Sequence, residues 1–101
     1  MPTAKQTAKT LTVGTSAVAF DPATDLGTNA HAMHRYLRVK NRSSTAEIAV
    51  HDGGGTAAID GDDVVHIPPF GSEIFDVTAL SIIASAASTK VEVCGDKGRL
   101  R

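Results

Sequence analysis

The sequence contains a single cysteine, Cys94, among its 101 residues. One cysteine cannot form an internal disulfide, so a disulfide scaffold is excluded. No histidine stands next to Cys94, and a lone cysteine near the end of a strand is most often a small packing residue. We therefore expect Cys94 to be neither a crosslink nor a nucleophile.

Aromatic residues are also scarce, at 4% of the chain with no Trp, although hydrophobic residues reach 42%. The apolar residues are mainly Ala, Val, Ile and Leu, which predicts a thin core that would benefit from contacts with neighbouring subunits. Carbohydrate sites usually stack sugars on exposed aromatic rings. One Tyr and three Phe offer little for such a site.

Neither sign of charge dominates, because 10 Lys and Arg stand against 11 Asp and Glu, a formal net charge of −1. A general nucleic-acid binder normally carries a clear basic excess, so this balance argues against nucleic acid, and also against a membrane surface, as a partner. No apolar run approaches about 18 residues, and the first residues do not resemble a signal peptide. We expect a soluble chain that is made and kept in the cytoplasm unless something else exports it.

What the sequence does contain is a strong period-2 alternation between Arg35 and Val50. Such alternation predicts strands with one face in a core and one face in water. The Ser43–Thr45 link is rich in hydroxyls that can bond nearby backbone, so the whole stretch predicts a β-hairpin. The inner face is assigned Leu37, Val39, Asn41, Ile48 and Val50, and the outer face Arg38, Lys40, Arg42 and Glu47.

Asn41 is the polar exception on the apolar face. An unpaired buried amide costs about 1–3 kcal/mol, so such an Asn usually bonds the backbone of an adjacent loop. We predict that Asn41 is a structural pin for the Ser43–Thr45 turn rather than a ligand-binding residue.

Further short strands are indicated at residues 10–13, 17–20, 64–67, 72–77 and 90–94, with turn signals such as Pro68-Pro69-Phe70-Gly71 between them. Residues 21–33 hold neither a helical nor a strand period and are expected to form a loop, with room for a short helix at residues 30–34. The connections look local, so consecutive strands are expected mostly to be neighbours in space.

About seven to eight short strands with regular turn signals predict an all-β fold. We expect a small antiparallel β-sandwich or barrel that is jelly-roll-like. The predicted core residues are Leu37, Val39, Ile48, Val50, Ile74, Val91 and Val93.

Both ends of the chain are polar, and they hold half of its 10 basic residues. Residues 1–10 predict a flexible N-terminal arm, residues 11–94 a single β-sandwich domain, and residues 95–101 a polar, basic C-terminal tail. We expect the arm and tail to bind neighbouring subunits. The expected assembly contacts are Lys5, Lys9, Lys97, Arg99 and Arg101.

The four histidines do not form a recognisable metal motif. His31 and His34 stand in the order His-Ala-Met-His, and a metal ion would need two further ligands at fixed offsets. His51 and His66 could supply them in principle, but solvated loop histidines are the expected state. We predict no metal site.

Two loop motifs between residues 53 and 63 suggest ions but lack essential parts. The glycines Gly53–Gly55 could expose backbone N–H groups to a phosphate, yet no Lys-Ser or Lys-Thr follows and no helix is predicted there. The Asp60–Asp63 cluster resembles part of a calcium loop without its remaining ligands and distant Glu. We expect a flexible inter-strand connection here and no cofactor.

The order of features over roughly residues 11–94 is informative as a whole. An Arg-Tyr-Leu strand ends in a buried Asn and is followed by a Ser/Thr turn, a Gly-rich loop, a Pro-x-Gly turn and an Ala-rich stretch before a Lys-Val-Glu-Val strand. This order resembles small virion structural proteins of tailed bacteriophages and prophages. The His31 and His34 loop and the Asp60–Asp63 cluster depart from the pattern. The matching residues here are Arg35, Tyr36, Leu37, Val39 and Asn41, then Gly53–Gly55, Pro69 and Gly71, and Ile83–Ala87.

The resemblance implies a β-sandwich in the virion that decorates or cements a capsid, or that occupies a head or tail accessory position. Its partners would be the major capsid protein or other virion proteins, with homo-oligomers on the particle. A carbohydrate- or receptor-binding module is the alternative. An enzyme is disfavoured because no nucleophile-elbow glycine pattern, paired His-Glu or Cys-His proximity is visible.

Overall fold

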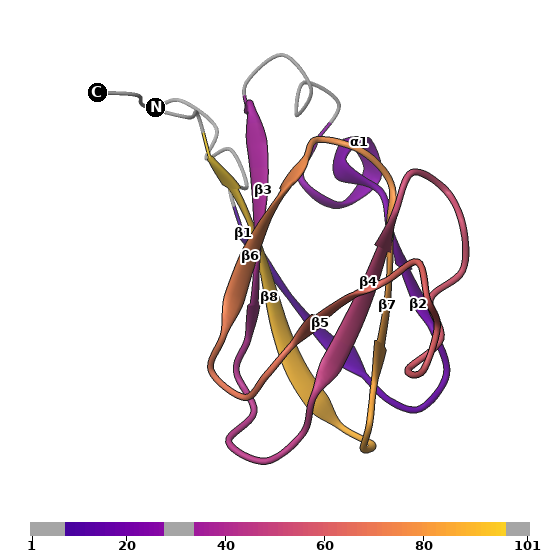
Figure 1. The fold of residues 1–101 in the computed structure, drawn as a ribbon. Helices are drawn as coiled ribbons and strands as arrows, with labels where there is room; N and C mark the ends of the chain where they lie inside the picture. The colour runs from indigo at the N-terminus through magenta and orange to yellow at the C-terminus, as the bar shows by residue number, and fades with distance from the viewer. Residues whose placement is uncertain (1–7, 28–33, 97–101) are drawn as a thin grey trace.

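The computed structural model describes residues 8–27 and 34–96, which contain eight strands and one short helix (Figure 1). The all-β prediction is confirmed. The strands are β1 (Ala8–Val13), β2 (Val18–Phe20), β3 (Tyr36–Asn41), β4 (Ile48–Asp52), β5 (Val65–Ile67), β6 (Ser72–Asp76), β7 (Leu80–Ala84) and β8 (Thr89–Asp96), and the helix is α1 (Pro22–Asp25).

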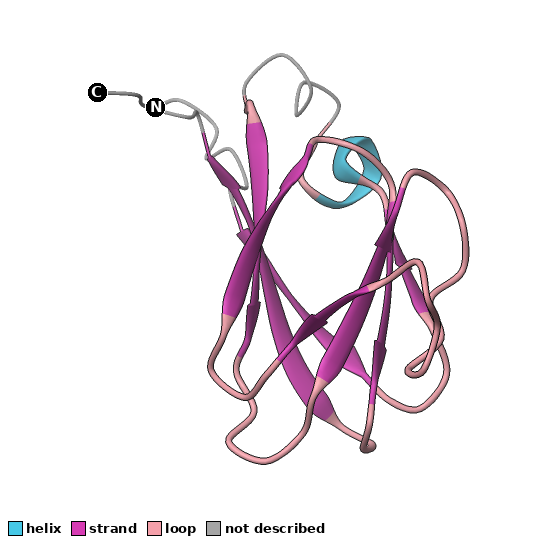
Figure 2. Cartoon of the chain, viewed as in Figure 1, coloured by secondary structure: helices cyan, strands magenta, loops and turns pink. Residues whose placement is uncertain are grey.

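The strands form two four-stranded antiparallel sheets that pack face to face (Figure 2). Sheet A has the order β1-β8-β3-β6, and sheet B has the order β2-β7-β4-β5. The pairs β1–β8, β2–β7, β3–β6 and β4–β5 are those of one long hairpin whose tip is the β4–β5 connection. The pairs β3–β8 and β4–β7 roll this hairpin into two layers, which is the jelly-roll arrangement that the sequence predicted.

The predicted β-hairpin between Arg35 and Val50 is wrong in its pairing. β3 belongs to sheet A and β4 to sheet B, so the Ser43–Thr45 link crosses between the layers. The expectation that consecutive strands are neighbours is also wrong, because among the described strands β4 and β5 are the only consecutive pair that bond to each other. The inner faces were assigned correctly, since the apolar side chains that they contain are at most 1% exposed.

The core fills the space between the two sheets. Its largest fully buried side chains are Phe20, Leu37, Ile48, Ile67 and Ile82. Removing each from water contributes about 1.5–3 kcal/mol. Of the seven predicted core residues, six are buried: Leu37, Val39, Ile48, Val50, Val91 and Val93.

The seventh, Ile74, was predicted wrongly. It is 50% exposed, whereas its neighbour Phe75 is 7% exposed. Phe75 lies opposite Leu37 and faces the core, and Ile74 lies opposite Arg38 on the outer face of sheet A. Because Ile74 and Phe75 are adjacent and both apolar, the sequence allows either of them to face the core. The register with β3 decides that Phe75 does.

The predicted loop at residues 21–33 contains a short helix at its start. Asp21 has an extended backbone and its side chain accepts a hydrogen bond from the backbone N–H of Ala23, while Pro22 occupies the first turn. Pro22 and the helix-ending Leu26 are buried, so α1 closes one end of the sandwich. Residues 28–33, with most of the helix suggested at 30–34, lie outside the described residues.

The sandwich extends beyond its predicted bounds of residues 11–94 at both ends. β1 already begins at Ala8, which pairs with Cys94, and β8 continues to Asp96. Residues 8–10 and 95–96 therefore belong to the sandwich, because the ladder between β1, β8 and β3 extends through them.

Candidate assembly surface

Both ends of the described chain meet at one end of sheet A. Ala8 at the start of β1 lies opposite Cys94, and Asp96 at the end of β8 lies opposite Tyr36. The segments 1–7 and 97–101 are therefore attached to neighbouring strands. Four of the predicted assembly contacts, Lys5, Lys97, Arg99 and Arg101, lie in these segments, outside the described residues.

Lys9, the fifth predicted contact, is engaged within its own chain. Its Nζ lies 2.7 Å from Asp25 Oδ1 and donates a hydrogen bond to it. This ion pair joins β1 to α1. Lys9 thus stabilises the end of the sandwich that both terminal segments leave.

Asp25 also supports α1 directly, because its Oδ2 accepts a hydrogen bond from the backbone N–H of Asp21 at 2.8 Å. Burial on its own tends to raise the pKa of Asp25. The hydrogen bonds from Lys9 and Asp21 and the positive charge of Lys9 outweigh burial, so the pKa lies below its ordinary value of 3.8. The carboxylate is consequently ionised and paired at neutral pH.

The outer face of sheet A carries a basic stripe. We define it as Arg38 and Lys40 on β3, Arg42 directly after β3, and Lys90 on β8. All four are exposed. Lys90 is the neighbour of Arg42, whose backbone N–H donates to the Lys90 carbonyl at 3.0 Å, and Lys90 Nζ donates to Thr12 Oγ1 at 2.7 Å. Within residues 8–27 and 34–96, no carboxylate forms an ion pair with Lys40, Arg42 or Lys90.

Alternation in the sequence assigns all four members of the basic stripe, Lys90 included, to outer faces, but it gives them no role. The spacing of two residues between Arg38, Lys40 and Arg42 was the available signal, because it places every basic side chain on one side of the strand. That Lys90 lies beside the other three could not be found from the sequence, since Lys90 joins the stripe only through the β3–β8 pairing.

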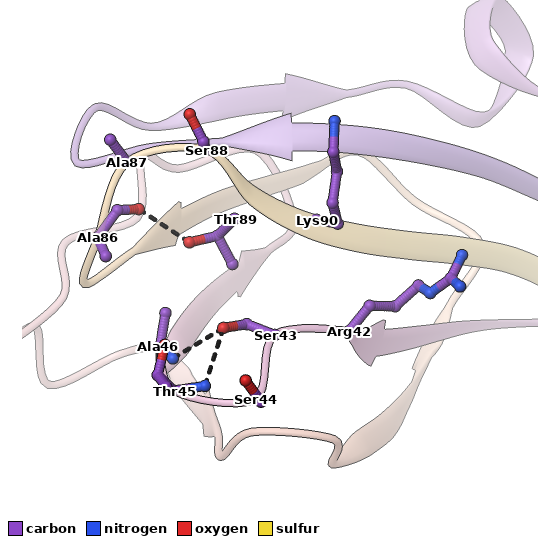
Figure 3. A pocket seen from close by; sticks show the side chains of 10 residues that line it. All are labelled: Arg42, Ser43, Ser44, Thr45, Ala46, Ala86, Ala87, Ser88, Thr89 and Lys90. Carbon is purple, nitrogen blue, oxygen red and sulfur yellow. Dashed lines mark hydrogen bonds between the residues drawn. The ribbon is translucent and has the colours of Figure 1, made fainter.

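A polar cleft of about 330 Å³ lies at the opposite end of the sandwich, between the β3–β4 connection and the β7–β8 turn (Figure 3). Two of its hydroxyls are used internally: Ser43 Oγ accepts from the backbone N–H groups of Thr45 and Ala46, and Thr89 Oγ1 donates to the Ala86 carbonyl. The lining residues include no carboxylate, histidine or cysteine. The cleft therefore places no carboxylate, imidazole or thiol beside its hydroxyls to activate them.

Asn41 is fully buried and bonds two of the residues that line this cleft, Ser43 and Ala46. Its Oδ1 accepts a hydrogen bond from the Ser43 backbone N–H at 3.0 Å. Its Nδ2 faces three carbonyl oxygens, those of Ala46 at 2.8 Å and of Ile67 and Pro68 at 3.2 Å. Asn41 thus links the β3–β4 crossover to the end of β5. The predicted role was to hold the Ser43–Thr45 turn, and the structure adds the contacts with Ile67 and Pro68.

The histidines occupy separate places. His34 is 6% exposed and not solvated as expected; its ring lies over Gly95, where a Cβ atom would come within 2.5 Å of it. His51 Nε2 lies 3.0 Å from Asp63 Oδ2, and His66 Nδ1 lies 3.1 Å from Glu47 Oε2. His31 lies outside the described residues. No three metal-ligating side chains gather in the part of the chain that the structure describes.

Ser81, His51 and Asp63 come together on the outer side of sheet B, an arrangement that the sequence spacing does not reveal. His51 lies opposite Ser81, and Asp63 bonds His51. Ser81 is only 7% exposed, and its Oγ accepts a hydrogen bond from the backbone N–H of Ala57 at 2.9 Å. This hydrogen bond and the His51–Asp63 contact hold the connection at residues 53–64 against sheet B.

That connection is anchored against sheet B. Ala57 is 4% exposed and packs with Ala49 and Ile83 in a small second apolar cluster outside the main core. Gly53 and Gly54 take positive φ angles of 89° and 104° where the chain leaves β4. Gly53 and Gly54 therefore serve the turn that ends β4, and within the described residues Asp60–Asp63 belong to no cluster of three metal-ligating side chains.

Comparisons with known proteins add no assignment: no protein-family model, curated protein or solved structure matches this chain. The described residues contain one helix, α1, which has four residues. No helix in this part of the chain is long and apolar enough to cross a membrane.

Proposed function

We propose that this chain is a structural subunit of a tailed-phage particle, a capsid decoration or cement protein that adds contacts between the subunits of the head shell. The observation that carries the proposal is the pairing of Ala8 with Cys94. It attaches two segments with basic residues, 1–7 and 97–101, to adjacent strands at one end of the sandwich.

Segments attached side by side can bind one neighbouring surface together. When the first segment is bound, the second is held at a high effective concentration, so two weak contacts act as one stronger contact. A shell repeats the same neighbour for every copy, which suits such a weak, repeated contact. Polar segments of this kind lose chain entropy on binding and gain backbone pairing and ion pairs.

The chemistry of the described residues supports an assembly role over catalysis. The polar cleft is lined by no carboxylate, histidine or cysteine, and the Oγ of Ser81 accepts a hydrogen bond from the backbone N–H of Ala57. Jelly rolls build viral capsid and lectin domains, which is an analogy of fold only.

The alternative is a carbohydrate- or receptor-binding module. One observation favours it: Phe70 is 64% exposed in the Pro68–Gly71 turn and has a φ of 62°. An exposed aromatic ring on a strained backbone is a candidate binding residue. A single ring provides little stacking area, so this function ranks second.

Particles purified on a density gradient from a lysate that contains the protein test the proposal. We expect the protein to sediment with the heads and to be released as salt rises, because charge contacts are screened. Protein that stays free of heads and binds a glycan array, with loss of that binding in Phe70→Ser, would establish the alternative.

A matched pair of variants locates the contact. The first changes the four terminal basic residues, Lys5, Lys97, Arg99 and Arg101, to Gln. The second changes the four residues of the basic stripe to Gln and alters the net charge by the same amount. We expect the first to leave heads at lower salt and the second to behave like the unaltered protein; the reverse order would place the contact on sheet A.

A further inference from the structure

We propose that β6 pairs with β6 of a second copy of this chain in a two-fold, antiparallel arrangement centred on Ile74. The inference stands apart from the proposed function, because it concerns a contact between identical copies. It begins with the position of β6 at the edge of sheet A, where its only strand neighbour in the described chain is β3.

The hydrogen-bond pattern decides which backbone groups of β6 face outward. In an antiparallel ladder, hydrogen-bonded and non-hydrogen-bonded pairs alternate. Asn41 N donates to the Gly71 carbonyl at 2.9 Å, so the next hydrogen-bonded pairs toward the other end of β6 are Val39–Glu73 and Leu37–Phe75. The N–H and C=O groups of Ser72, Ile74 and Asp76 therefore point away from β3.

The β3–β8 ladder gives the same result independently. Arg42 N donates to the Lys90 carbonyl, which makes Lys40–Glu92 and Arg38–Cys94 the hydrogen-bonded pairs with β8. The backbone N–H and C=O groups of Lys40 and Arg38 thus point toward β8. The backbone groups of their partners on β6, Ser72 and Ile74, therefore point away from β3 toward the open edge. No hydrogen bond from another described residue reaches these outward groups.

The edge is complementary to itself in one register. With Ile74 opposite Ile74 of the second copy, Ser72 lies opposite Asp76, and three residue pairs exchange two hydrogen bonds each. A shift of two positions leaves two such pairs, and one of the two shifts sets Glu73 against Glu73. Like charges directly opposite each other are destabilising, and the Ile74 register has none.

The side chains of this edge also favour strand addition. Ile74 is 50% exposed on the outer face, and two copies of it would cover each other. Natural edge strands are usually protected by charged side chains, above all Lys, by Pro or a bulge, or by being very short. β6 has five residues, Ser-Glu-Ile-Phe-Asp, without Lys or Pro, whereas β2 and β5 have three each. Its charged residues are Glu73 and Asp76, and in the Ile74 register neither lies opposite another carboxylate.

Because residue 74 would oppose itself, charge exchange at this position is a sharp test. Ile74→Lys and Ile74→Glu should each weaken the dimer about tenfold or more, since identical charges would meet. An equal mixture of the two should form a one-to-one heterodimer. Sedimentation velocity over about 10 μM to 1 mM covers the affinity expected for a small contact, and native mass spectrometry identifies the heterodimer.

Thiol crosslinking provides a second measurement, with Cys94→Ser as the background. Ile74→Cys should crosslink to itself with a short bis-maleimide. Ser72→Cys alone should crosslink much more slowly, because two copies of residue 72 would be about 13 Å apart along the strands, and its mixture with Asp76→Cys should crosslink readily. A monomeric unaltered protein at 1 mM, a dimer indifferent to both charge variants, or equal crosslinking at 72 and 74 would each overturn the proposal.

Discussion

Replacing Asn41 by Ala removes the side chain that joins the β3–β4 crossover to the end of β5. The change leaves the Ser43 backbone N–H and the carbonyls of Ala46 and Ile67 without their partner in a buried place. At about 1 kcal/mol for each lost bond, the free energy of unfolding should fall by about 3 kcal/mol. For a domain of this size that corresponds to a loss of about 12–24 °C in Tm.

Ser43→Ala is the matched control, because it lies in the same turn and removes the two hydrogen bonds that Ser43 Oγ accepts from backbone N–H groups. Ser43 is only half-buried, so water can replace its hydroxyl, and we expect a loss of about 1 kcal/mol. Thermal unfolding followed by circular dichroism compares the two variants. An Asn41→Ala protein no less stable than Ser43→Ala would refute the reasoning that Asn41 is the buried link.

Three further outcomes follow from the structure. Val39→Asp should prevent soluble folding, because an unpaired charge would enter a fully buried site; recovery of soluble protein with native-like thermal unfolding would show that the inner face is misassigned. The pKa of Asp25 is lower in the folded protein than in the unfolded chain. The pair with Lys9 therefore stabilises the fold at pH values above the unfolded-state pKa of about 3.8, and this stabilisation is lost as pH falls through the lower folded-state pKa. Denaturant titrations of the unaltered protein and Lys9→Met should therefore differ by about 0.5–1 kcal/mol at pH 6 and converge toward pH 3, and a difference that grows in acid would contradict this sign. Elemental analysis of purified protein should find no stoichiometric zinc, and one metal ion per chain would contradict the prediction that the histidines bind none.

Period-2 alternation predicted the faces of the strands well, because burial of one face is a local property of the sequence. Leu37 and Val39 had to point inward whichever strand lay beside them. The pairing of β3 and β4 was not predictable in the same way, since the Ser43–Thr45 link is equally able to turn back within a sheet or to cross to the other one. Pairing is decided by long-range contacts, which alternation does not encode.

The candidate site was less accessible from the sequence than the fold. Lys9 and Asp25 are 16 positions apart and form an ion pair only because α1 folds over the end of β1. The Asp21-Pro22 dipeptide did carry a signal for that helix, as a capping residue followed by Pro at the first helical position. The grouping of His51, Asp63 and Ser81 had no local signal in the sequence, because the β4–β7 pairing places Ser81 opposite His51.

The two proposed contacts have a geometric consequence when they are combined. The terminal segments leave sheet A at the Asp76 end of β6, because Tyr36 lies opposite both Asp76 and Asp96. In a two-fold pairing of β6 strands, Asp76 of one copy lies opposite Ser72 of the other, so the two copies direct their terminal ends in opposite directions along one eight-stranded sheet. Such a dimer would hold two pairs of terminal segments at a fixed distance, so it could contact two neighbouring shell subunits at once. A monomer has both terminal segments at one end, so these segments could contact only one neighbouring shell subunit.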